Sequence, residues 1–209
     1  MPVCKSFVNN GSTFVKVWQI VETETDLKEN LSLTKASLDR LNAMKSESHR
    51  KGFLAVRQLL KCFNYSDQDL YYNTDGKPFL KDGKHISISH SFAYAAIVIS
   101  KVAVGVDIEK CREKIPRLAS KFIDYEEHFL NKNLNSEIER LTAIWTTKEA
   151  LYKFYGKAGL SLKSECMVLP FSIESTSGVS WILDKDQKVK CYWTRSKIED
   201  HFLTMCVNE

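Results

Sequence analysis

Two carboxylates, Asp107 and Glu109, are separated by a single residue within the segment 105–110. Val106 and Ile108 alternate with them, which predicts a strand with one apolar side and with both acids on the other side. Neighbouring carboxylates repel each other unless a cation, a proton or an arginine neutralises them. Mg²⁺ suits such oxygen ligands, because it is commonly held by one or two carboxylates together with substrate phosphates. Taken alone, so short a pattern is better explained by a solvated strand face.

Glu149 and Lys153 form a second candidate pair, in the run WTTKEALYK at 145–153. Their i, i+4 spacing places them on one face of a predicted helix, with Trp145 one turn earlier on roughly the same side. The pair alone is better explained as a surface ion pair worth a few tenths of a kcal/mol, with Trp145 in the core. A functional interpretation therefore depends on what lies beside this helix.

A third cluster, SISHS at 87–91, ends a predicted strand, where loops begin and ligands tend to dock. It contains Ser89 and His90. A single histidine is more often structural than catalytic, but His90 together with Arg50 and Lys77 has the charge needed to neutralise phosphates. The cluster is therefore compatible with a phosphorylated ligand.

Apolar periodicity predicts the elements that would carry these residues. Alternating apolar residues predict strands at 13–23, 85–89, 95–100 and 102–109, and in the tail at 167–175, 179–184, 188–196 and 201–207. Helical spacing predicts helices within 26–63, from 116 to 131 and from 136 to 155, where Gly156 and Gly159 follow as helix-ending residues. Turn residues occupy 64–67 and 73–76.

This order of elements predicts an α+β fold with mainly antiparallel sheets. We expect two similar, pseudo-symmetric halves, residues 1–102 and residues 103–209, each an antiparallel sheet packed with helices. The acids that would bind a metal fall in the second half. The chain has 209 residues, of which 44% are hydrophobic, and only 4 prolines and 8 glycines, so we expect a compact core and no long disordered stretch.

Charge and cysteine content narrow the class of protein. The net charge of +4 can attract an anionic ligand or an acidic partner, but it falls short of the basic stripe of a dedicated nucleic-acid binder. The six cysteines are scattered, without a CxxC pair or zinc-like spacing. The first residues lack the apolar core of a signal peptide, and no window approaches the ~18 apolar residues that cross a bilayer. We therefore expect a reduced, cytoplasmic protein with no nucleic-acid and no membrane partner.

Taken together, the motifs GVDIEK, WTTKEALYK and SISHS resemble the signature of the 4′-phosphopantetheinyl transferase superfamily, in particular its surfactin-synthetase-activating type. The resemblance extends over the region 49–162. It implies a monomer made of two pseudo-symmetric halves. It also implies the activity of a holo-[acyl-carrier-protein] synthase, which transfers 4′-phosphopantetheine from coenzyme A to a serine of an acyl, polyketide or peptidyl carrier protein and releases 3′,5′-ADP.

The resemblance further implies roles in catalysis. Asp107, Glu109 and Glu149 would coordinate Mg²⁺, and Lys153 would contact the phosphate that is transferred. Asp107, Glu149 and Lys153 are thus the catalytic candidates. The proton of the carrier serine has two candidate acceptors, Glu149 and a metal-bound water, and the sequence does not choose between them. Glu127 matches an acid of the family pattern whose role stays open.

The same resemblance implies that six further positions bind coenzyme A: Arg50, Gly76, Lys77, Pro78, Ser89 and His90. Ser89 and His90 would hold the nucleotide end, with His90 near the 3′-phosphate. Arg50 would meet the same phosphate, and the Gly-Lys-Pro element would lie along the adenine.

A docking surface for the carrier protein is also predicted. The resemblance implies that the carrier proteins are acidic, so the basic and apolar helix at 116–130, with its flanking loops, is one candidate. The basic residues of this region are Lys114, Arg117, Lys121 and Lys132, and its apolar ones include Ile115, Leu118 and Phe122. An amphipathic helix that packs on its own core is an equally good explanation.

Two other classes of function stay open. A metal-dependent phosphohydrolase also uses paired acids on a strand, and release of 3′,5′-ADP without an acceptor protein would favour it. The third possibility is a module that binds coenzyme A or a carrier protein without turnover. Three metal ligands count against that interpretation, because a binder would not need them.

Overall fold

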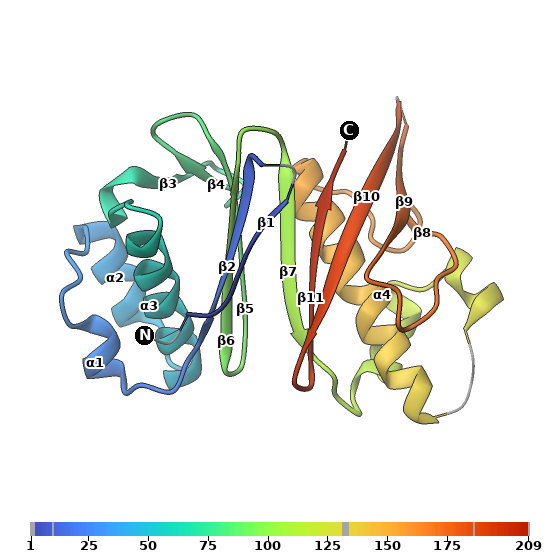
Figure 1. The fold of residues 1–209 in the computed structure, drawn as a ribbon, viewed down its shortest axis with the longest axis horizontal. Helices are drawn as coiled ribbons and strands as arrows, with labels where there is room; N and C mark the ends of the chain where they lie inside the picture. The colour runs from blue at the N-terminus through green and yellow to red at the C-terminus, as the bar shows by residue number, and fades with distance from the viewer. Residues whose placement is uncertain (1–2, 10, 131–133, 186, 209) are drawn as a thin grey trace. The chain divides into compact units, whose positions relative to one another are not determined.

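The computed structural model of the chain describes residues 3–9, 11–130, 134–185 and 187–208, and it divides into two compact units (Figure 1). The first unit comprises Met1–Val102 and the second Ala103–Glu209. Each unit combines an antiparallel sheet with a long helix, so the predicted α+β fold with mainly antiparallel sheets is confirmed. Among the described helices, none is long and apolar enough to cross a membrane.

The sheet of the first unit has four strands in the order β1-β2-β6-β5, and every pairing is antiparallel. The strands are β1 (Val3–Asn9), β2 (Thr13–Gln19), β5 (His85–Ser91) and β6 (Tyr94–Ser100). Every residue of β6 is buried, as expected for a central strand composed almost entirely of apolar residues. β5 lies at the edge of this sheet and carries the SISHS cluster at its end.

Three helices cover one face of this sheet (Figure 1): α1 (Glu24–Lys28), α2 (Lys35–Ala43) and α3 (Glu47–Cys62). α3 is amphipathic, and the Ser46 hydroxyl caps it by accepting a hydrogen bond from the His49 backbone N–H. The turn η1 (Asp67–Asp69) and a short hairpin of β3 (Leu70–Tyr72) and β4 (Pro78–Leu80) complete the unit. The apolar face of α3 therefore forms the core with the sheet.

A buried ion pair holds the helices of the first unit together. Arg57 of α3 lies 3.0 Å from Asp67 of η1, and neither side chain is more than 4% exposed. The Asp67 carboxylate also accepts hydrogen bonds from the Thr34 backbone N–H and from the Ser37 hydroxyl, at the start of α2. These hydrogen bonds hold the pKa of Asp67 below its usual value even though its burial acts in the opposite direction.

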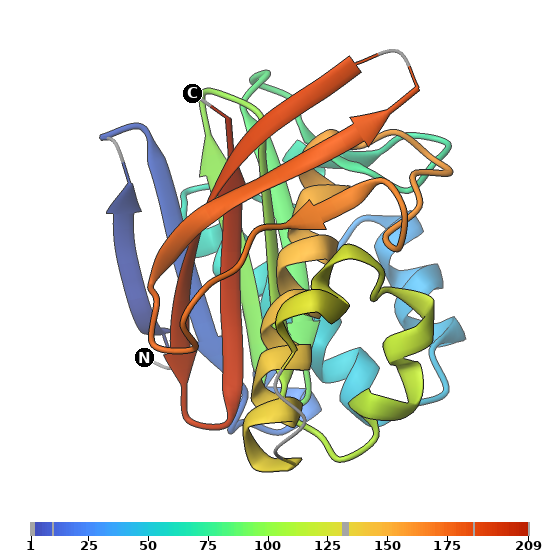
Figure 2. The same ribbon diagram turned by 90° about the vertical axis from the view of Figure 1, so that its right-hand side faces the viewer.

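The sheet of the second unit has five strands in the order β7-β11-β10-β9-β8, all antiparallel (Figure 2). They are β7 (Val104–Lys110), β8 (Cys166–Val168), β9 (Ser177–Asp184), β10 (Gln187–Ile198) and β11 (His201–Val207). The long helix α4 (Leu134–Tyr155) packs against β7, β11 and β8. Gly156 follows it in the left-handed conformation, with a φ of 67°, which ends the helix.

β7 comes very close to the backbone of α4 at Gly105. A Cβ atom at this position would lie 1.9 Å from the carbonyl oxygen of Ala150 and 2.5 Å from the amide nitrogen of Phe154. Only glycine therefore fits between the strand and the helix. Asp107 follows Gly105 by two residues, so its side chain leaves β7 on the same side, toward α4.

Two predicted elements are wrong in type or extent. The segment 116–131 is not an α-helix, because its described part forms two 3₁₀ helices, η2 (Ile115–Lys121) and η3 (Tyr125–Phe129). The bend between them brings Glu126 to the buried side chain of Lys148 on α4. In the tail, the strand predicted over 167–175 is limited to β8, because Pro170 has no backbone N–H for the sheet. β1 is a strand that the periodicity does not predict.

The predicted carrier-protein dock is also wrong for two of its three apolar residues, while Leu118 is half-buried. Ile115 and Phe122 are 6% and 0% exposed, and both pack in a core cluster with apolar residues of α4. These side chains are unavailable to a partner because the unit's own core uses them. Arg117 and Lys121 are exposed, and Lys132 lies outside the described residues.

Gly105→Ala is expected to destabilise the protein, because the added methyl group meets backbone atoms of α4 that cannot rotate away. We expect the free energy of unfolding to fall by about 3 kcal/mol, at the upper end of the cost of overpacking. Urea unfolding followed by circular dichroism measures this change. A loss below about 0.5 kcal/mol, the size of an ordinary surface substitution, would show that the strand and the helix are not in this contact.

Candidate active site

The second unit brings two of the catalytic candidates into direct contact. The ammonium group of Lys153, on α4, lies 2.7 Å from Oδ1 of Asp107, on β7. The Asp107 side chain is 4% exposed and that of Lys153 is 27% exposed. Shielding from water strengthens such a pair relative to one on the open surface. The pair therefore joins the C-terminal turns of α4 to the acidic part of β7.

Glu149 lies one turn before Lys153 on α4 and is half-buried. Burial is the largest cause that raises the pKa of Glu149, to about 7, and the negative charges of Asp107 and Glu109 raise it further, while Lys153 acts in the opposite direction. The three acids are thus near enough for their charges to repel one another. The structure brings together the four residues that the sequence assigns to the metal and to the transferred phosphate.

The three acids are donors of the type that binds a hard divalent cation. They offer only carboxylate oxygens, which Mg²⁺ prefers, and a bound cation would relieve the repulsion that raises the pKa of Glu149. Within the described part of the chain, no three His, Cys, Asp or Glu side chains are already gathered closely enough to hold a metal ion. The acids therefore fit a divalent cation by charge and by ligand type, and the magnesium site stays a prediction.

Side chains just before Glu149 anchor α4 to the sheet. Thr146 shares a hydrogen bond of 3.0 Å with Thr204 of β11, whose register partner on β7 is Asp107. Arg195 of β10 donates to the hydroxyl of Thr147 at 2.9 Å. Two strands of the sheet therefore fix this segment of the helix.

A buried ion pair provides another anchor. The ammonium group of Lys148 lies 2.8 Å from Oε2 of Glu126 and 2.7 Å from the carbonyl oxygen of Phe122, and both side chains of the pair are 0% exposed. The Oε1 atom of Glu126 accepts a hydrogen bond of 2.8 Å from the Val168 backbone N–H. Glu127, the acid that the family pattern suggests, is exposed. The buried acid of this segment is therefore Glu126.

In the first unit, two imidazoles lie together at the end of β5. The ring of His90 lies against Gly52 of α3, where a Cβ atom would come within 2.9 Å of its Nδ1. The ring centroids of His90 and His49 are 6.2 Å apart. His49 and Gly52 are three residues apart and share one face of α3. This face of α3 therefore lies beside a second imidazole, so that His49 and His90 can face one ligand.

Arg50 makes its contacts with α1 and with the loop between α2 and α3. Its Nε lies 2.7 Å from the Glu24 carboxylate, and its Nη1 donates to the carbonyl oxygens of Met44 and Lys45 at 3.0 and 3.2 Å. Arg50 follows His49 directly, so the two side chains leave α3 about 100° apart. The contacts of Arg50 are thus with Glu24 and with backbone carbonyls, and its role toward a phosphate stays a prediction.

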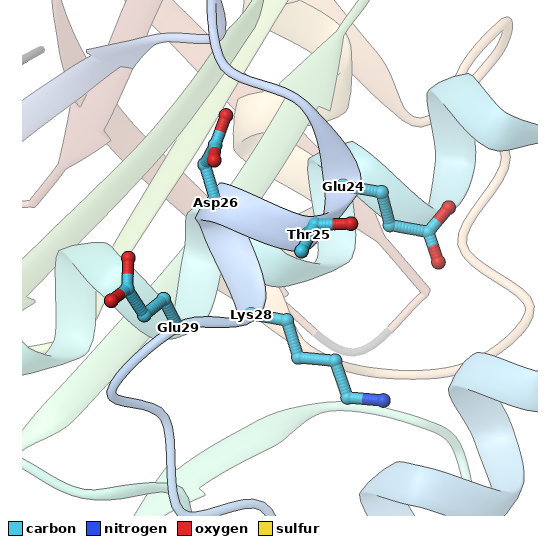
Figure 3. A pocket seen from close by; sticks show the side chains of 5 residues that line it. All are labelled: Glu24, Thr25, Asp26, Lys28 and Glu29. Carbon is cyan, nitrogen blue, oxygen red and sulfur yellow. The ribbon is translucent and has the colours of Figure 1, made fainter.

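A hollow beside α1 includes the Glu24 side chain (Figure 3). Its lining consists of Glu24, Thr25, Asp26, Lys28 and Glu29. Glu24 and Lys28 project to one side in Figure 3, and Asp26 and Glu29 project to the other. Three acids against one lysine disfavour an anion such as a phosphate, so this hollow is no candidate for the nucleotide.

Gly76, Lys77 and Pro78 lie where the chain turns from β3 into β4. The Asn73 side chain accepts a hydrogen bond of 2.8 Å from the Lys77 backbone N–H, and Gly76 has a φ of 80°. Burial lowers the pKa of Lys77. An anionic partner would favour the charged form of this lysine and offset the effect of burial.

Three residues that shape these sites have roles that the sequence motifs do not predict: His49, Gly105 and Glu126. His49 has a usable signal, because it stands three residues before a glycine that allows close packing on its helix. Glu126 has no such signal in the sequence, because an acid outside any motif is expected to be exposed. Gly105 belongs to the GVDIEK motif, but its need to be glycine depends on α4, which lies far along the chain.

Comparison with known proteins identifies relatives of the chain. Residues 103–206 match the sequence model of the 4′-phosphopantetheinyl transferase superfamily. The 4′-phosphopantetheinyl transferase gsp of Aneurinibacillus migulanus is 29% identical over 153 residues, which cover 71% of this chain and 58% of that protein. The transferase Sfp of Bacillus subtilis strain 168 is 29% identical over 127 residues, covering 56% of each chain. The chain thus spans less than two thirds of the length of these two relatives.

Glu149→Gln is expected to stabilise the protein at alkaline pH. The pKa of Glu149 rises from an ordinary 4.5 to about 7 on folding, so its ionised form destabilises the folded state increasingly between these values and fully above pH 7. The uncharged amide should raise the free energy of unfolding by about 2–3 kcal/mol at pH 8 and by less than about 1 kcal/mol at pH 5. Urea unfolding in EDTA at both pH values measures the gain. The same gain at both would contradict the assignment.

Proposed function

We propose that the chain, whose residues 103–206 match the 4′-phosphopantetheinyl transferase superfamily, transfers 4′-phosphopantetheine from coenzyme A to a serine of an acyl or peptidyl carrier protein. Within this family we propose the holo-[acyl-carrier-protein] synthase reaction, which converts the apo carrier protein into the holo form. The observation that carries the proposal is the convergence of Asp107, Glu109, Glu149 and Lys153. Three mutually repelling carboxylates beside a lysine suit a phosphoryl transfer in which a divalent cation holds the pyrophosphate.

The reaction exchanges one phosphorus–oxygen bond for another. The serine oxygen bonds to the phosphate that carries pantetheine, the phosphoanhydride bond breaks, and 3′,5′-ADP leaves with the bonding electrons. Negative charge therefore grows on the transferred phosphate and on the leaving group. Lys153 would stabilise this charge, because it is the partly exposed cation of the site.

Either Glu149 or a metal-bound water would accept the serine proton. Asp107, Glu109 and Glu149 would hold Mg²⁺, which when bound neutralises charge on the pyrophosphate. Asp107 also holds Lys153 in place through the ion pair between them.

Residues of the first unit would bind the nucleotide of coenzyme A. The adjacent imidazoles of His49 and His90 support a role toward the 3′-phosphate. Ser89 would bind the same end of the nucleotide. The half-buried Lys77 supports a second anion contact. Gly76 and Pro78 would shape the loop along the adenine. Arg50 would contribute only if it contacts a phosphate and Glu24 at the same time.

The proposal includes a monomer in the cytoplasm that acts without a nucleic-acid or membrane partner. The thiols of Cys62, Cys111, Cys166, Cys191 and Cys206 are free, as in a protein from a reducing compartment. Fatty-acid, polyketide and nonribosomal-peptide carrier proteins present similar serines, so each belongs in the assay. The test is mass spectrometry of apo carrier proteins incubated with the protein, coenzyme A and Mg²⁺. The expected result is a gain of one phosphopantetheine. Release of 3′,5′-ADP with unmodified carrier would instead identify a phosphohydrolase.

Asp107→Asn is expected to lower kcat for the transfer by about 100-fold or more, because it removes both a candidate metal ligand and the partner of Lys153. Asp39→Asn is the matched control, since Asp39 forms an exposed ion pair with Lys35 on α2. The control should transfer at the wild-type rate. A wild-type rate for Asp107→Asn would show that Asp107 has no part in the reaction.

Lys153→Met should separate turnover from binding. A group that stabilises mainly the transition state affects kcat more than ligand affinity. We expect kcat to fall about 100-fold while the Kd for coenzyme A, from calorimetry, changes less than about threefold. Equal losses in kcat and in affinity would show that Lys153 acts in ground-state binding instead.

A further inference from the structure

The Lys148–Glu126 pair connects three separate segments of the second unit. Lys148 belongs to α4, Glu126 to η3, and the second carboxylate oxygen of Glu126 accepts the N–H of Val168 on β8. The Lys148 ammonium also donates to the carbonyl oxygen of Phe122, which precedes η3. Besides their contact with each other, the two side chains therefore have two polar partners in fixed directions, the Phe122 carbonyl and the Val168 N–H, and the pair is completely shielded from water.

Stability alone is a weak reason for such a pair. Removing two charges from water costs several kcal/mol for each ion, and their attraction offsets this only in part. The pair lies beside a cluster of apolar residues, including Phe122, Ile144 and Val168, where apolar side chains would also pack. What distinguishes the ion pair from an apolar contact is that its hydrogen bonds have fixed directions. They therefore allow α4 only one rotation about its axis.

Glu149 depends on that rotation. Among the described residues, no hydrogen bond or ion pair holds its carboxylate, so the orientation of α4 determines where the carboxylate points. Lys148 is the preceding residue, and successive side chains of an α-helix differ in direction by about 100°. Fixing Lys148 toward Glu126 therefore fixes Glu149 toward the acids of β7.

We propose that the buried Lys148–Glu126 pair is a positioning device, which holds α4 in the rotation that directs Glu149 toward Asp107 and Glu109. This inference rests on the proposed function of those acids as ligands of one divalent cation. Lys148 and Glu126 touch neither the cation nor the substrate, and they act through Glu149.

The test replaces the pair and leaves the acids intact. The double variant Lys148→Met, Glu126→Gln removes both charges, fills a similar volume and keeps an amide oxygen for the Val168 N–H. We expect its Tm in EDTA to equal or exceed that of the wild type. The increase in Tm produced by Mg²⁺ should fall by at least about half, and the Mg²⁺ concentration for half-maximal transfer should rise about tenfold. The KM for coenzyme A should change less than about twofold.

The first unit offers a matched control. Arg57→Met, Asp67→Asn removes a buried ion pair of similar exposure in the first unit, whereas the proposed ligands belong to the second unit. It should leave both the Mg²⁺-induced shift and the Mg²⁺ dependence of transfer unchanged, whatever its effect on Tm. The loss of a buried ion pair as such is thereby separated from a loss of positioning. Should the first double variant fail to fold, Glu126→Gln alone is expected to show a smaller loss of the Mg²⁺-induced shift.

The outcomes separate this inference from the proposed function. A wild-type protein that neither gains stability from Mg²⁺ nor modifies a carrier protein overturns the proposed function. A wild type that does both, together with a double variant that retains its Mg²⁺ shift and Mg²⁺ dependence, overturns the positioning role alone. A single variant with an unchanged shift overturns it as well.

Discussion

The contact between β7 and the backbone of α4 determines the geometry of the candidate active site. Gly105 lets the strand approach the helix more closely than any other residue would. Two residues later, Asp107 reaches Lys153, and Glu149 comes under the charge of both acids of β7. A larger residue at position 105 would separate the elements and therefore the charges. The chemistry of the second unit thus depends on a position that has no side chain.

The same packing has a cost in stability. The raised pKa of Glu149 means that the folded protein holds its ionised form less favourably than water does. The fold tolerates this because other contacts hold α4, including the hydrogen bond from Thr146 to Thr204 and the buried pair of Lys148 with Glu126. A protein selected only for stability would not keep three acids in this arrangement. The repulsion is explained if a divalent cation normally joins them.

Local periodicity predicts much of this site and little of its assembly. Alternation places Asp107 and Glu109 on one side of a strand, and the i, i+4 rule places Glu149 and Lys153 on one side of a helix. No local rule brings the strand to the helix, and only the family resemblance predicts their meeting. The charge pattern fails at Glu126 and Lys148, because charged residues are expected at the surface and these two are buried. The 3₁₀ segments around Glu126 follow from that tertiary contact. In the first unit, adjacency in sequence is misleading: Arg50 follows His49, yet the ring of His49 lies beside that of His90 while Arg50 pairs with Glu24.

The most direct test of the account is a crystal structure of the protein with coenzyme A and Mg²⁺. The account predicts one ion with carboxylate oxygens of Asp107, Glu109 and Glu149 as ligands, at the ~2.0–2.1 Å typical of magnesium. The pyrophosphate of coenzyme A would complete the coordination. An ion bound elsewhere, or a Glu149 carboxylate turned away from it, would contradict the claim that these acids share one cation.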